Sequence, residues 1–457
     1  MPPLDVTNPY TGEVLATLEE VGTDAVGRAV ARAKACLPPP PAAERAEILE
    51  RAARIVGERA ERLARTICAE AAKPITQARG EVARCRDTLI YSAIEARTLA
   101  GELVPMDGTS AGAGKVAYIV HEPIGVIGAI SPFNFPLNLV AHKIAPAVAA
   151  GCPVVLKPAE VTPLSGIALV EILHEAGLAE DALQVVIGSG AVVGNALVEH
   201  PDVAMISFTG SPKVGWGIRE RAPRKHVALE LGNSTPVIVA EDADLEAAAA
   251  KIAASGFTHA GQSCISVQRV YVHRSVHGAL LERLVPKVEA LVVGDPADEA
   301  TQVGPVITED AQRRVMEWIG QAREAGARVL TGGTEEGRII RPTVLDGIAP
   351  DMRVSCEEVF GPVVGVAAYD TLDEAVELAN SSPYGLQAGI FTARVDHAMA
   401  WARRLDFAGV VINDTPTFRA DQQPYGGVKD SGNTREGPRY AVRSMTEPKL
   451  VVVALPG

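Results

Sequence analysis

Four short apolar segments decide the fold: VVLK (154–157), LQVVIG (183–188), AMISFTG (204–210) and HVALELG (226–232). Each has the length and apolar character of a buried strand, and helical stretches separate one from the next. Strands that alternate with helices in this way form βαβ units, which build a parallel sheet with helices on both faces. The sequence therefore predicts an α/β fold with a doubly wound sheet.

The rest of the chain extends this pattern on both sides. A second alternating series runs from Pro236 to about Val411 and predicts a second α/β unit. A last strand, 449–455, has no partner nearby in the sequence. Pairing either with residues 116–120 or with another subunit would cover an exposed edge. The elements expected before the first series are a hairpin at 1–20, helices over 22–101, and strands at 116–122 and 124–131.

The composition limits the class of protein. A chain of 457 residues is too long for one ordinary core, and 47% hydrophobic with 22% charged residues is typical of globular proteins. The formal net charge of −13 argues against nucleic acid or an anionic membrane as the main partner, because both require a basic face. The N-terminal sequence lacks the features of a secretory signal, and the longest apolar run, 144–156, is too short to span a bilayer. A cytoplasmic protein is expected.

The six cysteines contain no CxxC pair, so the usual zinc and dithiol spacings are absent. His273 and His277 lack the glutamate of an HExxH site, and no metal is expected. Cys264 differs from the others, because GQSC places it at a glycine-marked turn between a helical run and the strand ISVQRVYV. A thiol in such a turn is a candidate nucleophile, but a single cysteine is more often an inert hydrophobe. Other residues must therefore supply a base and an oxyanion donor.

Polar residues follow the carboxyl ends of the predicted strands, where an open α/β sheet binds its ligands. Lys157 and Glu160 suit the two hydroxyls of a ribose, because one donates and the other accepts hydrogen bonds. Gly210 and Ser211 open a helix whose free amides favour a phosphate. Glu230 ends its own strand. Each position alone is equally typical of an ordinary solvated residue.

Two further loops carry polar side chains. Asn134, between the aromatics of SPFNFP, either stabilises a turn or donates its amide to an oxyanion. Glu358, in EEVFGP, is by itself typical of a solvated acid. Two phosphate-loop lookalikes fail, since GSGAVVG (188–194) spaces its last glycine one residue too far for GxGxxG, and Gly114-Lys115 lacks the rest of a Walker A loop. A dinucleotide would need another arrangement.

Seven motifs occur in order along the chain: PFNFP, VVLKPAE, FTGS, LELG, GQSC, EEVFGPV and PYGGVKDSG. In this order and spacing the chain resembles the aldehyde dehydrogenase superfamily, from NPYTGEV near its start to EPKLVVV near its end. The resemblance implies an aldehyde dehydrogenase-like fold with a Rossmann-like cofactor domain, an α/β catalytic domain and a small β oligomerisation element. The implied ranges are 1–114 with 124–231, then 232–432, and 115–123 with 440–457. The implied assembly is a homodimer or homotetramer.

The resemblance also implies a role for individual residues. Cys264 matches the nucleophile, Glu230 the general base, and Asn134 the side chain that forms the oxyanion hole with the Cys264 backbone N–H. The residues that match cofactor contacts are Lys157 and Glu160 at the adenosine ribose, Gly210 and Ser211 at the pyrophosphate, Glu358 at the nicotinamide ribose, Phe360 near the nicotinamide ring, and Phe133.

On this basis we expect oxidation of an aldehyde to its carboxylic acid, through a thiohemiacetal and a thioester on Cys264 that water hydrolyses with Glu230 as base. Glu160 would repel a 2′-phosphate, which favours NAD over NADP as the cofactor. The alternatives are a CoA-acylating enzyme, an NADP-dependent semialdehyde or non-phosphorylating glyceraldehyde-phosphate dehydrogenase, and a non-catalytic protein on the same scaffold.

The segment INDTPTFRADQQPYGGVK (412–429) resembles the lactaldehyde dehydrogenase-like branch of the superfamily. We therefore expect a short hydroxyaldehyde or semialdehyde as substrate and hypothesise that Arg419 helps to shape the substrate mouth. The chain also departs from common patterns. Asn233-Ser234 follows LELG where many members have Gly-Lys. Ser263 precedes Cys264 where the methylmalonate-semialdehyde and phosphorylated-glyceraldehyde enzymes often carry arginine.

Overall fold

The computed structural model describes residues 3–456, and its first sheet is the one that the four segments predict. The strands are β5 (Val126–Ile130), β6 (Val154–Lys157), β7 (Leu183–Val185), β8 (Val203–Thr209) and β9 (His226–Glu230). They lie in the order β7-β6-β5-β8-β9, and every neighbouring pair is parallel. The order reverses between β5 and β8. A doubly wound sheet opens a ligand crevice at this point, beyond its carboxyl edge.

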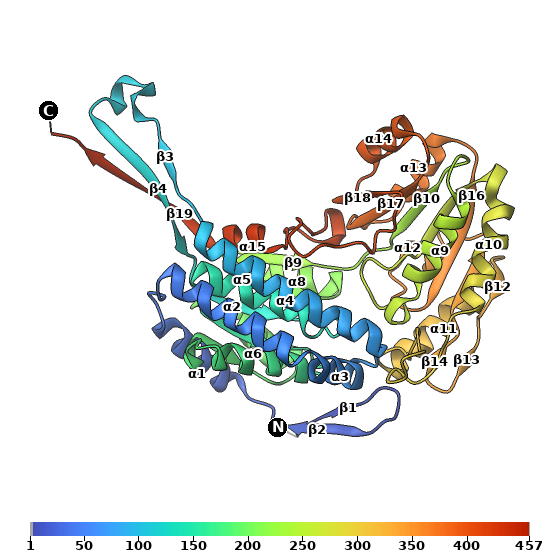
Figure 1. Ribbon diagram of the computed structural model, residues 1–457, viewed down its shortest axis with the longest axis horizontal. Coiled ribbons are helices and arrows are strands. Elements are labelled where there is room, and N and C mark those ends of the chain that lie inside the picture. Colours follow the sequence, from blue (N-terminus) through green and yellow to red (C-terminus); the bar gives the residue numbers. More distant parts are fainter. Residues whose placement is uncertain (1–2, 457) are drawn as a thin grey trace.

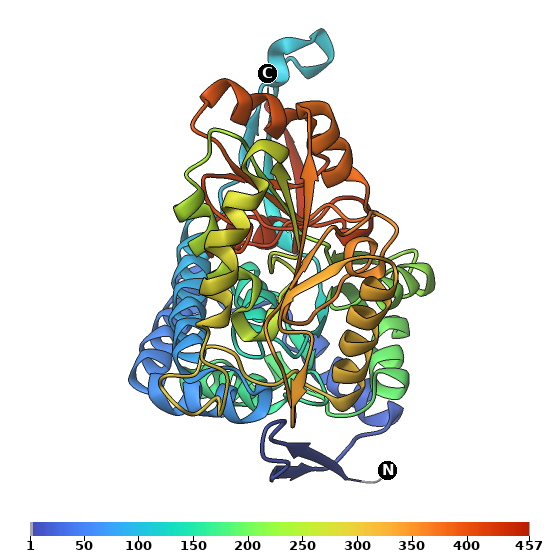
Figure 2. The ribbon, with the colours of Figure 1, turned by 90° about the vertical axis from the view of Figure 1, so that its right-hand side faces the viewer.

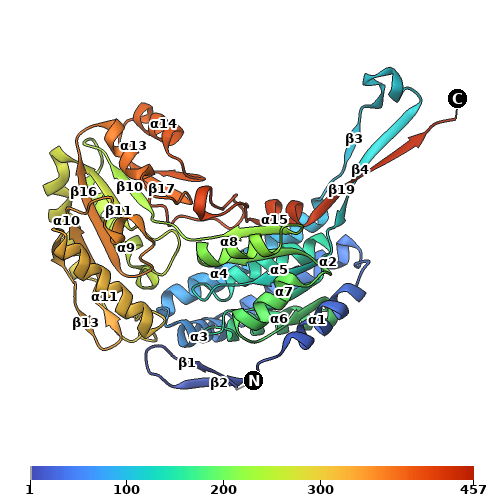
Figure 3. The same ribbon diagram turned by 180° about the vertical axis from the view of Figure 1, so that it is seen from behind.

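Helices cover both faces of this sheet, because its buried side chains alternate between two cores (Figures 1 and 3). The helices are α1 (Thr23–Ala35), α2 (Ala42–Glu58), α3 (Ala60–Ala71), α4 (Ile75–Thr98), α5 (Asn138–Ala150), α6 (Leu164–Glu175), α7 (Asn195–Glu199) and α8 (Pro212–Arg221). Ile127 and Ala129 pack with α2, α4, α5 and α6, whereas Val126 and Ile130 pack with α1, α7 and α8 on the opposite face.

The second sheet is built from the alternating series that begins at Pro236. Its order is β12-β15-β16-β11-β10-β17-β18, parallel throughout except for the β12–β15 pair. The strands are β10 (Pro236–Val239), β11 (Arg269–His273), β12 (Arg328–Thr331), β15 (Thr343–Asp346), β16 (Val363–Tyr369), β17 (Gln387–Phe391) and β18 (Gly409–Ile412). A separate small ribbon consists of β13 (Glu335–Glu336) and β14 (Ile339–Ile340). The helices are α9 (Leu245–Gly256), α10 (His277–Glu289), α11 (Glu309–Glu324), α12 (Arg353–Cys356), α13 (Leu372–Asn380) and α14 (Val395–Arg404). In Figure 2 this half of the molecule lies toward the viewer.

Buried carboxylates cap two helices of the first half. The first part of the apolar run that is too short for a membrane, residues 144–150, lies in α5, and every residue of this helix is buried. Glu81 accepts hydrogen bonds from the Leu137 and Asn138 amides at its start and pairs with the buried Lys73. Glu70 accepts from Leu164 and Ser165 at the start of α6. These caps satisfy helix-end amides that cannot reach water.

A β arm projects from the first half, with the last strand at its edge (Figure 1). In it, β4 (Lys115–Pro123) lies between β3 (Glu102–Val104) and β19 (Thr446–Ala454), and both pairings are antiparallel. The first of the two pairings that the sequence leaves open, that of β19 with β4, is therefore present. The range 440–457 begins too early for a strand, because residues up to 444 belong to α15 (Pro438–Ser444), and 457 lies outside the described residues.

The N-terminal segment and the first helices agree with the sequence. β1 (Leu4–Thr7) and β2 (Val14–Leu18) form the expected antiparallel hairpin. The helices break between α1 and α2, where the chain carries four successive prolines at 38–41. Proline fixes its own φ and restricts the residue before it, so a helix cannot continue through such a run.

The Glu70 cap makes stability depend on pH. Burial raises the pKa of Glu70 from 4.5 to about 7. The folded protein therefore binds this proton more tightly than the unfolded chain. The associated stability is present below pH 4.5 and is lost as pH rises to about 7. The free energy of unfolding of the wild type should fall by about 3 kcal/mol over this interval. Glu70→Gln should abolish this fall.

Urea unfolding followed by circular dichroism at a series of pH values measures this decline. Glu171→Gln changes an exposed carboxylate on α6, the helix whose start Glu70 caps. This control should keep the pH dependence of the wild type. Parallel curves for wild type and Glu70→Gln would contradict the prediction.

Candidate active site

A pocket of about 990 Å³ lies at the carboxyl edge of the first sheet and extends to the loops of the second half. Residues after β5, β6, β8 and β9 line it, as the reversal of strand order predicts. The sequence-predicted residues that line it are Cys264, Glu230, Asn134, Lys157, Gly210, Ser211, Phe133, Glu358 and Phe360. Glu160 and Arg419 are not among its lining residues; Glu160 contacts Lys157, and Arg419 stacks on Tyr425.

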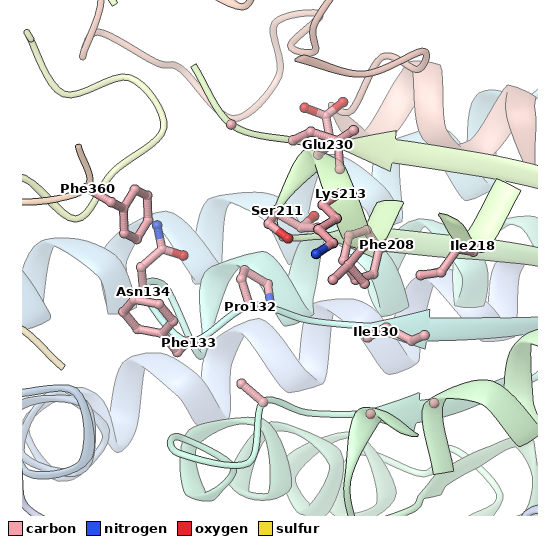
Figure 4. Close-up of a pocket in the computed structure, with 18 of the residues that line it drawn as sticks. Ile130, Pro132, Phe133, Asn134, Phe208, Ser211, Lys213, Ile218, Glu230 and Phe360 are labelled. Carbon is pink, nitrogen blue, oxygen red and sulfur yellow. The ribbon is translucent and has the colours of Figure 1, made fainter. Parts of the chain in front are cut away.

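Figure 4 shows how part of this lining is arranged. Asn134 lies beside Phe133 and Phe360 at one end, while Ser211 and Lys213 lie farther along the pocket. The Phe133 and Phe360 rings meet edge to face, with centroids 5.7 Å apart. The two loops that carry them come from different sheets. This aromatic contact therefore joins the two halves at the pocket.

A sharply bent turn places Cys264 at the pocket. His259, Ala260 and Gly261 all have left-handed backbone angles, with φ of 50°, 53° and 72°. A side chain at Gly261 would come within 2.1 Å of the Gly361 carbonyl oxygen, so only glycine fits there. Successive left-handed residues are uncommon and cost energy, which is typical of backbone held for a functional purpose.

The Cys264 thiol is half-buried and has one hydrogen-bond partner within residues 3–456. The Tyr425 hydroxyl lies 2.9 Å from its sulfur. Burial raises the pKa of the Cys264 thiol to about 12, and the Tyr425 hydrogen bond opposes that shift. Burial thus favours the protonated thiol, and its ionisation requires neighbouring groups that stabilise the thiolate.

Asn134 is buried next to the nucleophile loop. Its amide nitrogen donates to the Gln262 carbonyl at 2.9 Å, which fixes the side chain against the residues that precede Cys264. A side-chain amide has two N–H donors, and among the described residues only this one acceptor is present. The second N–H therefore remains available to a ligand.

Glu230, the last residue of β9, is 4% exposed, and neither carboxyl oxygen has a hydrogen-bond partner among the described residues. Burial, and then the charge of Glu436, raises the pKa of Glu230 well above its ordinary value. The strand end is held by hydrogen bonds from the Gly210 amide to the Glu230 carbonyl and from the Leu231 amide to the Ser431 carbonyl. A buried carboxyl group without partners is costly, and such groups are typical of functional sites.

The end of the pocket near Lys157 includes a loop that the sequence led us to dismiss. Glu160 accepts hydrogen bonds from the Lys157 ammonium at 3.2 Å and from the Gly190 amide at 2.8 Å. Gly190, Ala191 and Gly194 line the pocket. The segment fails the GxGxxG spacing but lies at the same edge of the sheet, because it follows β7. Its position after a strand was the signal available in the sequence.

The start of α8 offers free amides to an anion. Ser211 occupies the N-cap position, yet its side chain makes no capping hydrogen bond, unlike the glutamates at α5 and α6. Ser211, Lys213 and Val214 line the pocket, so the first turn of α8 borders it, although Pro212 itself has no N–H. Lys213, Arg221 and Arg314 also line the pocket and were missed, because isolated basic residues carry no sequence pattern.

The Asn233-Ser234 departure from the common pattern lies behind Glu358. The Asn233 amide donates to the Glu358 carboxylate at 3.0 Å, and the Ser234 hydroxyl donates to the Ser355 carbonyl at 2.6 Å. A side chain at Gly232 would come within 2.4 Å of the same carboxylate. Burial raises the pKa of Glu358 to about 7. Glu358 is thus a positioned pocket residue and not a solvated acid.

Arg419 is buried in a charged cluster beside the nucleophile. Its guanidinium lies 3.0 Å from the Glu436 carboxylate and 3.3 Å from the His142 ring, and it stacks 3.7 Å above the centre of the Tyr425 ring. His142 in turn contacts Asp421 at 2.9 Å. The role in substrate binding assigned to Arg419 stays a prediction.

A family model described as aldehyde dehydrogenase family matches residues 2–451. The chain belongs to this family. A 3-sulfolactaldehyde dehydrogenase of Priestia megaterium is 46% identical over 453 residues, which covers 99% of this chain and 95% of that protein. A lactaldehyde dehydrogenase of Methanocaldococcus jannaschii is 38% identical, over 99% of this chain and 97% of that one.

Solved structures of this family agree with the fold. A glyceraldehyde-3-phosphate dehydrogenase from Methanocaldococcus jannaschii, complexed with NADP, has a TM-score of 0.96 and 37% identity, covering 99% of both chains. Aldehyde dehydrogenase 21 from Physcomitrella patens, in complex with the reaction product succinate, has a TM-score of 0.96 and 40% identity, covering 99% of this chain and 95% of that one. The predicted fold class is therefore confirmed.

Two further properties of the described residues bear on function. Residues 3–456 include no helix long and apolar enough to cross a membrane. The same part of the chain has no cluster of three or more His, Cys, Asp or Glu side chains that could hold a metal ion.

Proposed function

We propose that this aldehyde dehydrogenase oxidises a short, negatively charged aldehyde to its carboxylic acid with NAD, through a covalent intermediate on Cys264. The observation that carries the proposal is the convergence of Cys264, Asn134 and Glu230 on one pocket from three separate segments. A nucleophile, an oxyanion donor and a base are the groups that acyl chemistry requires.

In the first half of the reaction the Cys264 thiolate adds to the aldehyde carbon and forms a thiohemiacetal. The negative charge moves to the aldehyde oxygen, where the free Asn134 N–H and the Cys264 backbone N–H stabilise it. Asn134 is already held by Gln262, so little reorganisation accompanies this step. Loss of hydride from the former aldehyde carbon leaves a thioester on Cys264.

In the second half Glu230 removes a proton from water, which attacks the thioester and releases the acid and the free thiol. Burial raises the pKa of Glu230, which makes its carboxylate a stronger base than an exposed one. Its two oxygens have no partners among the described residues, so they are free to hold the water.

The pocket residues fit a dinucleotide. Glu160 and Lys157 would hold the adenosine ribose, the uncapped start of α8 would hold the pyrophosphate, and Glu358 would hold the nicotinamide ribose. Glycine at 210 leaves room there, because a side chain would come within 2.6 Å of the Phe208 ring. When bound, the nicotinamide supplies the hydride acceptor.

Substitutions of the nucleophile and the base should separate the two halves of the reaction. Cys264→Ala should abolish NADH formation. Glu230→Gln should keep a burst of about one NADH per site and slow the steady state by about a hundredfold or more, because only deacylation needs the base. Stopped-flow absorbance measures both phases, and Cys356→Ala, outside the pocket lining, is the matched control.

An unchanged steady state in Glu230→Gln would count against Glu230 as the base. Stimulation of the wild type by CoA would favour the acylating alternative.

Glu160 supports NAD over NADP. Its carboxylate is already fixed by Lys157 and Gly190 and would repel a 2′-phosphate at the ribose. We expect the kcat/KM of the wild type to be about tenfold or more higher with NAD than with NADP. Glu160→Gln should lower this NAD-to-NADP ratio, because it removes one charge repulsion of about 1–2 kcal/mol. Glu180→Gln, an exposed change outside the pocket lining, is the control. Equal wild-type values for the two cofactors would contradict the assignment.

The charged cluster beside Cys264 supports a negatively charged substrate. Arg419 is 5% exposed on its side chain, and its Nε has no partner among the described residues, so a buried cationic donor stays open near the nucleophile. A carboxylate or sulfonate two or three bonds from the aldehyde would satisfy this donor. Sulfolactaldehyde and succinate, named for two of the similar proteins, carry such groups.

Substitution of Arg419 tests this class. Arg419→Lys should lower kcat/KM for succinic semialdehyde by about tenfold or more, because a charge-assisted hydrogen bond contributes about 1.5–3 kcal/mol. Lactaldehyde and propanal, which are uncharged, should be affected much less. Equal losses for charged and uncharged aldehydes, or no change for any of them, would contradict the role.

The β arm supports assembly of a homodimer or homotetramer. The free edge of β19 and its exposed apolar side chains, Leu450 and Val452, are unsuited to water. We expect light scattering to give a dimer or tetramer, and Leu450→Lys with Val452→Lys to reduce its size. Val14→Lys, at an equally exposed apolar residue of β2, is the control. A monomeric wild type would overturn the expectation.

A further inference from the structure

Tyr425 contacts the reacting sulfur but has no role in the reaction steps proposed for Cys264, Asn134 and Glu230. Its hydroxyl oxygen lies 2.9 Å from Sγ of Cys264. We propose that Tyr425 is a catalytic residue, whose hydroxyl donates a hydrogen bond to the Cys264 sulfur and holds it as the nucleophilic thiolate. This inference rests on the proposed function, because it takes Cys264 as the nucleophile.

The surroundings of Tyr425 fix its hydroxyl in place. The Tyr425 amide donates to the Glu436 carbonyl at 3.1 Å, and an added side chain at Gly426 would come within 2.1 Å of the Thr434 carbonyl oxygen. Ile265 and Leu386 pack with the Tyr425 ring and Cys264 in one small apolar cluster. The ring therefore has no room to turn its hydroxyl away from the sulfur.

The Cys264 thiolate needs this donor because burial and most of the nearby charged groups disfavour a negative charge on the sulfur. Burial raises the pKa of the Cys264 thiol, and the carboxylates of Glu358 and Glu230 raise it further, while Arg419 lowers it. Tyr425 is the only hydrogen-bond partner of the sulfur within residues 3–456. A hydrogen bond to the charged form stabilises that form and lowers the pKa of the thiol.

Arg419 is a positioning residue that acts through the tyrosine ring. Its guanidinium lies 3.7 Å from the centre of the ring, and Glu436 holds it at 3.0 Å. A cation on the ring face draws electron density from the ring and so makes the hydroxyl a stronger donor. Glu436 also pairs with Tyr425 through the backbone, so the carboxylate, the guanidinium and the phenol form one unit.

The proposed step is a simple ionisation. The S–H bond breaks, its electron pair stays on sulfur, and the proton passes to bulk water. Tyr425 keeps its own proton, because burial and the neighbouring Cys264 raise the pKa of its hydroxyl well above the ordinary value. Once sulfur bonds to the aldehyde carbon it loses its charge, and this hydrogen bond weakens.

Alkylation of the thiol by iodoacetamide tests the inference without aldehyde or cofactor. The rate is measured from pH 7 to 10 on the full-length protein, and mass spectrometry of the peptides reports Cys264 separately. Tyr425→Phe should slow alkylation of Cys264 about tenfold and displace its rise with pH by about one unit toward alkaline pH, as expected for loss of one charge-assisted hydrogen bond. Cys356 in the same samples should react at an unchanged rate.

Tyr440→Phe, at an exposed tyrosine, is the matched control and should behave as wild type. Phenylalanine keeps the ring and its stacking on Arg419, and an unchanged melting temperature would show that Tyr425→Phe remains folded. Arg419→Lys offers a second variant and should displace the profile in the same direction by a smaller amount.

An identical Cys264 profile in wild type and folded Tyr425→Phe would overturn the inference, even if the wild type oxidises aldehydes as proposed. Conversely, a displaced profile supports the inference even if no aldehyde is oxidised, in which case the proposed function alone fails.

Discussion

The reversal of strand order between β5 and β8 is the constraint on which the site depends. Parallel strands direct their carboxyl ends to one edge, and helices leaving in opposite directions open that edge at the reversal. Asn134 follows β5 and Ser211 follows β8, so both residues line the pocket at this edge. The second sheet then only has to bring Cys264 and Phe360 across the opening.

Burial gives these residues their chemistry. In water, Glu230 would be an ordinary weak base and Glu358 an ordinary solvated acid. Removed from water, both bind protons more tightly, and the Cys264 thiol becomes reluctant to ionise. A buried thiol therefore needs a hydrogen-bond donor, and the cluster of Tyr425, Arg419 and Glu436 provides one. Within this cluster the Nε–H of Arg419 has no partner among the described residues.

Burial also distinguishes the helix starts that glutamates cap in the interior from the start of α8, which borders the pocket. Glu81 and Glu70 cap α5 and α6 in the interior, where free amides would be costly. The start of α8 has no such cap and faces the pocket, where a ligand phosphate can take its place. Of these three helices, α8 is the one that begins at the pocket without a capping carboxylate.

The family, the alternation of strands and helices, and the candidates Cys264, Asn134 and Glu230 could be read from the amino-acid sequence, because period, turn chemistry and ordered motifs are local properties of a chain. Which loops meet at the pocket became clear only from the folded molecule. The glycine-rich loop at 188–194 joined the pocket despite its spacing, and Arg419 proved to be buried against Tyr425, whose contact with Cys264 no motif indicates. Contacts between residues some 160 positions apart depend on how the two sheets pack, and that packing is not encoded in any single stretch.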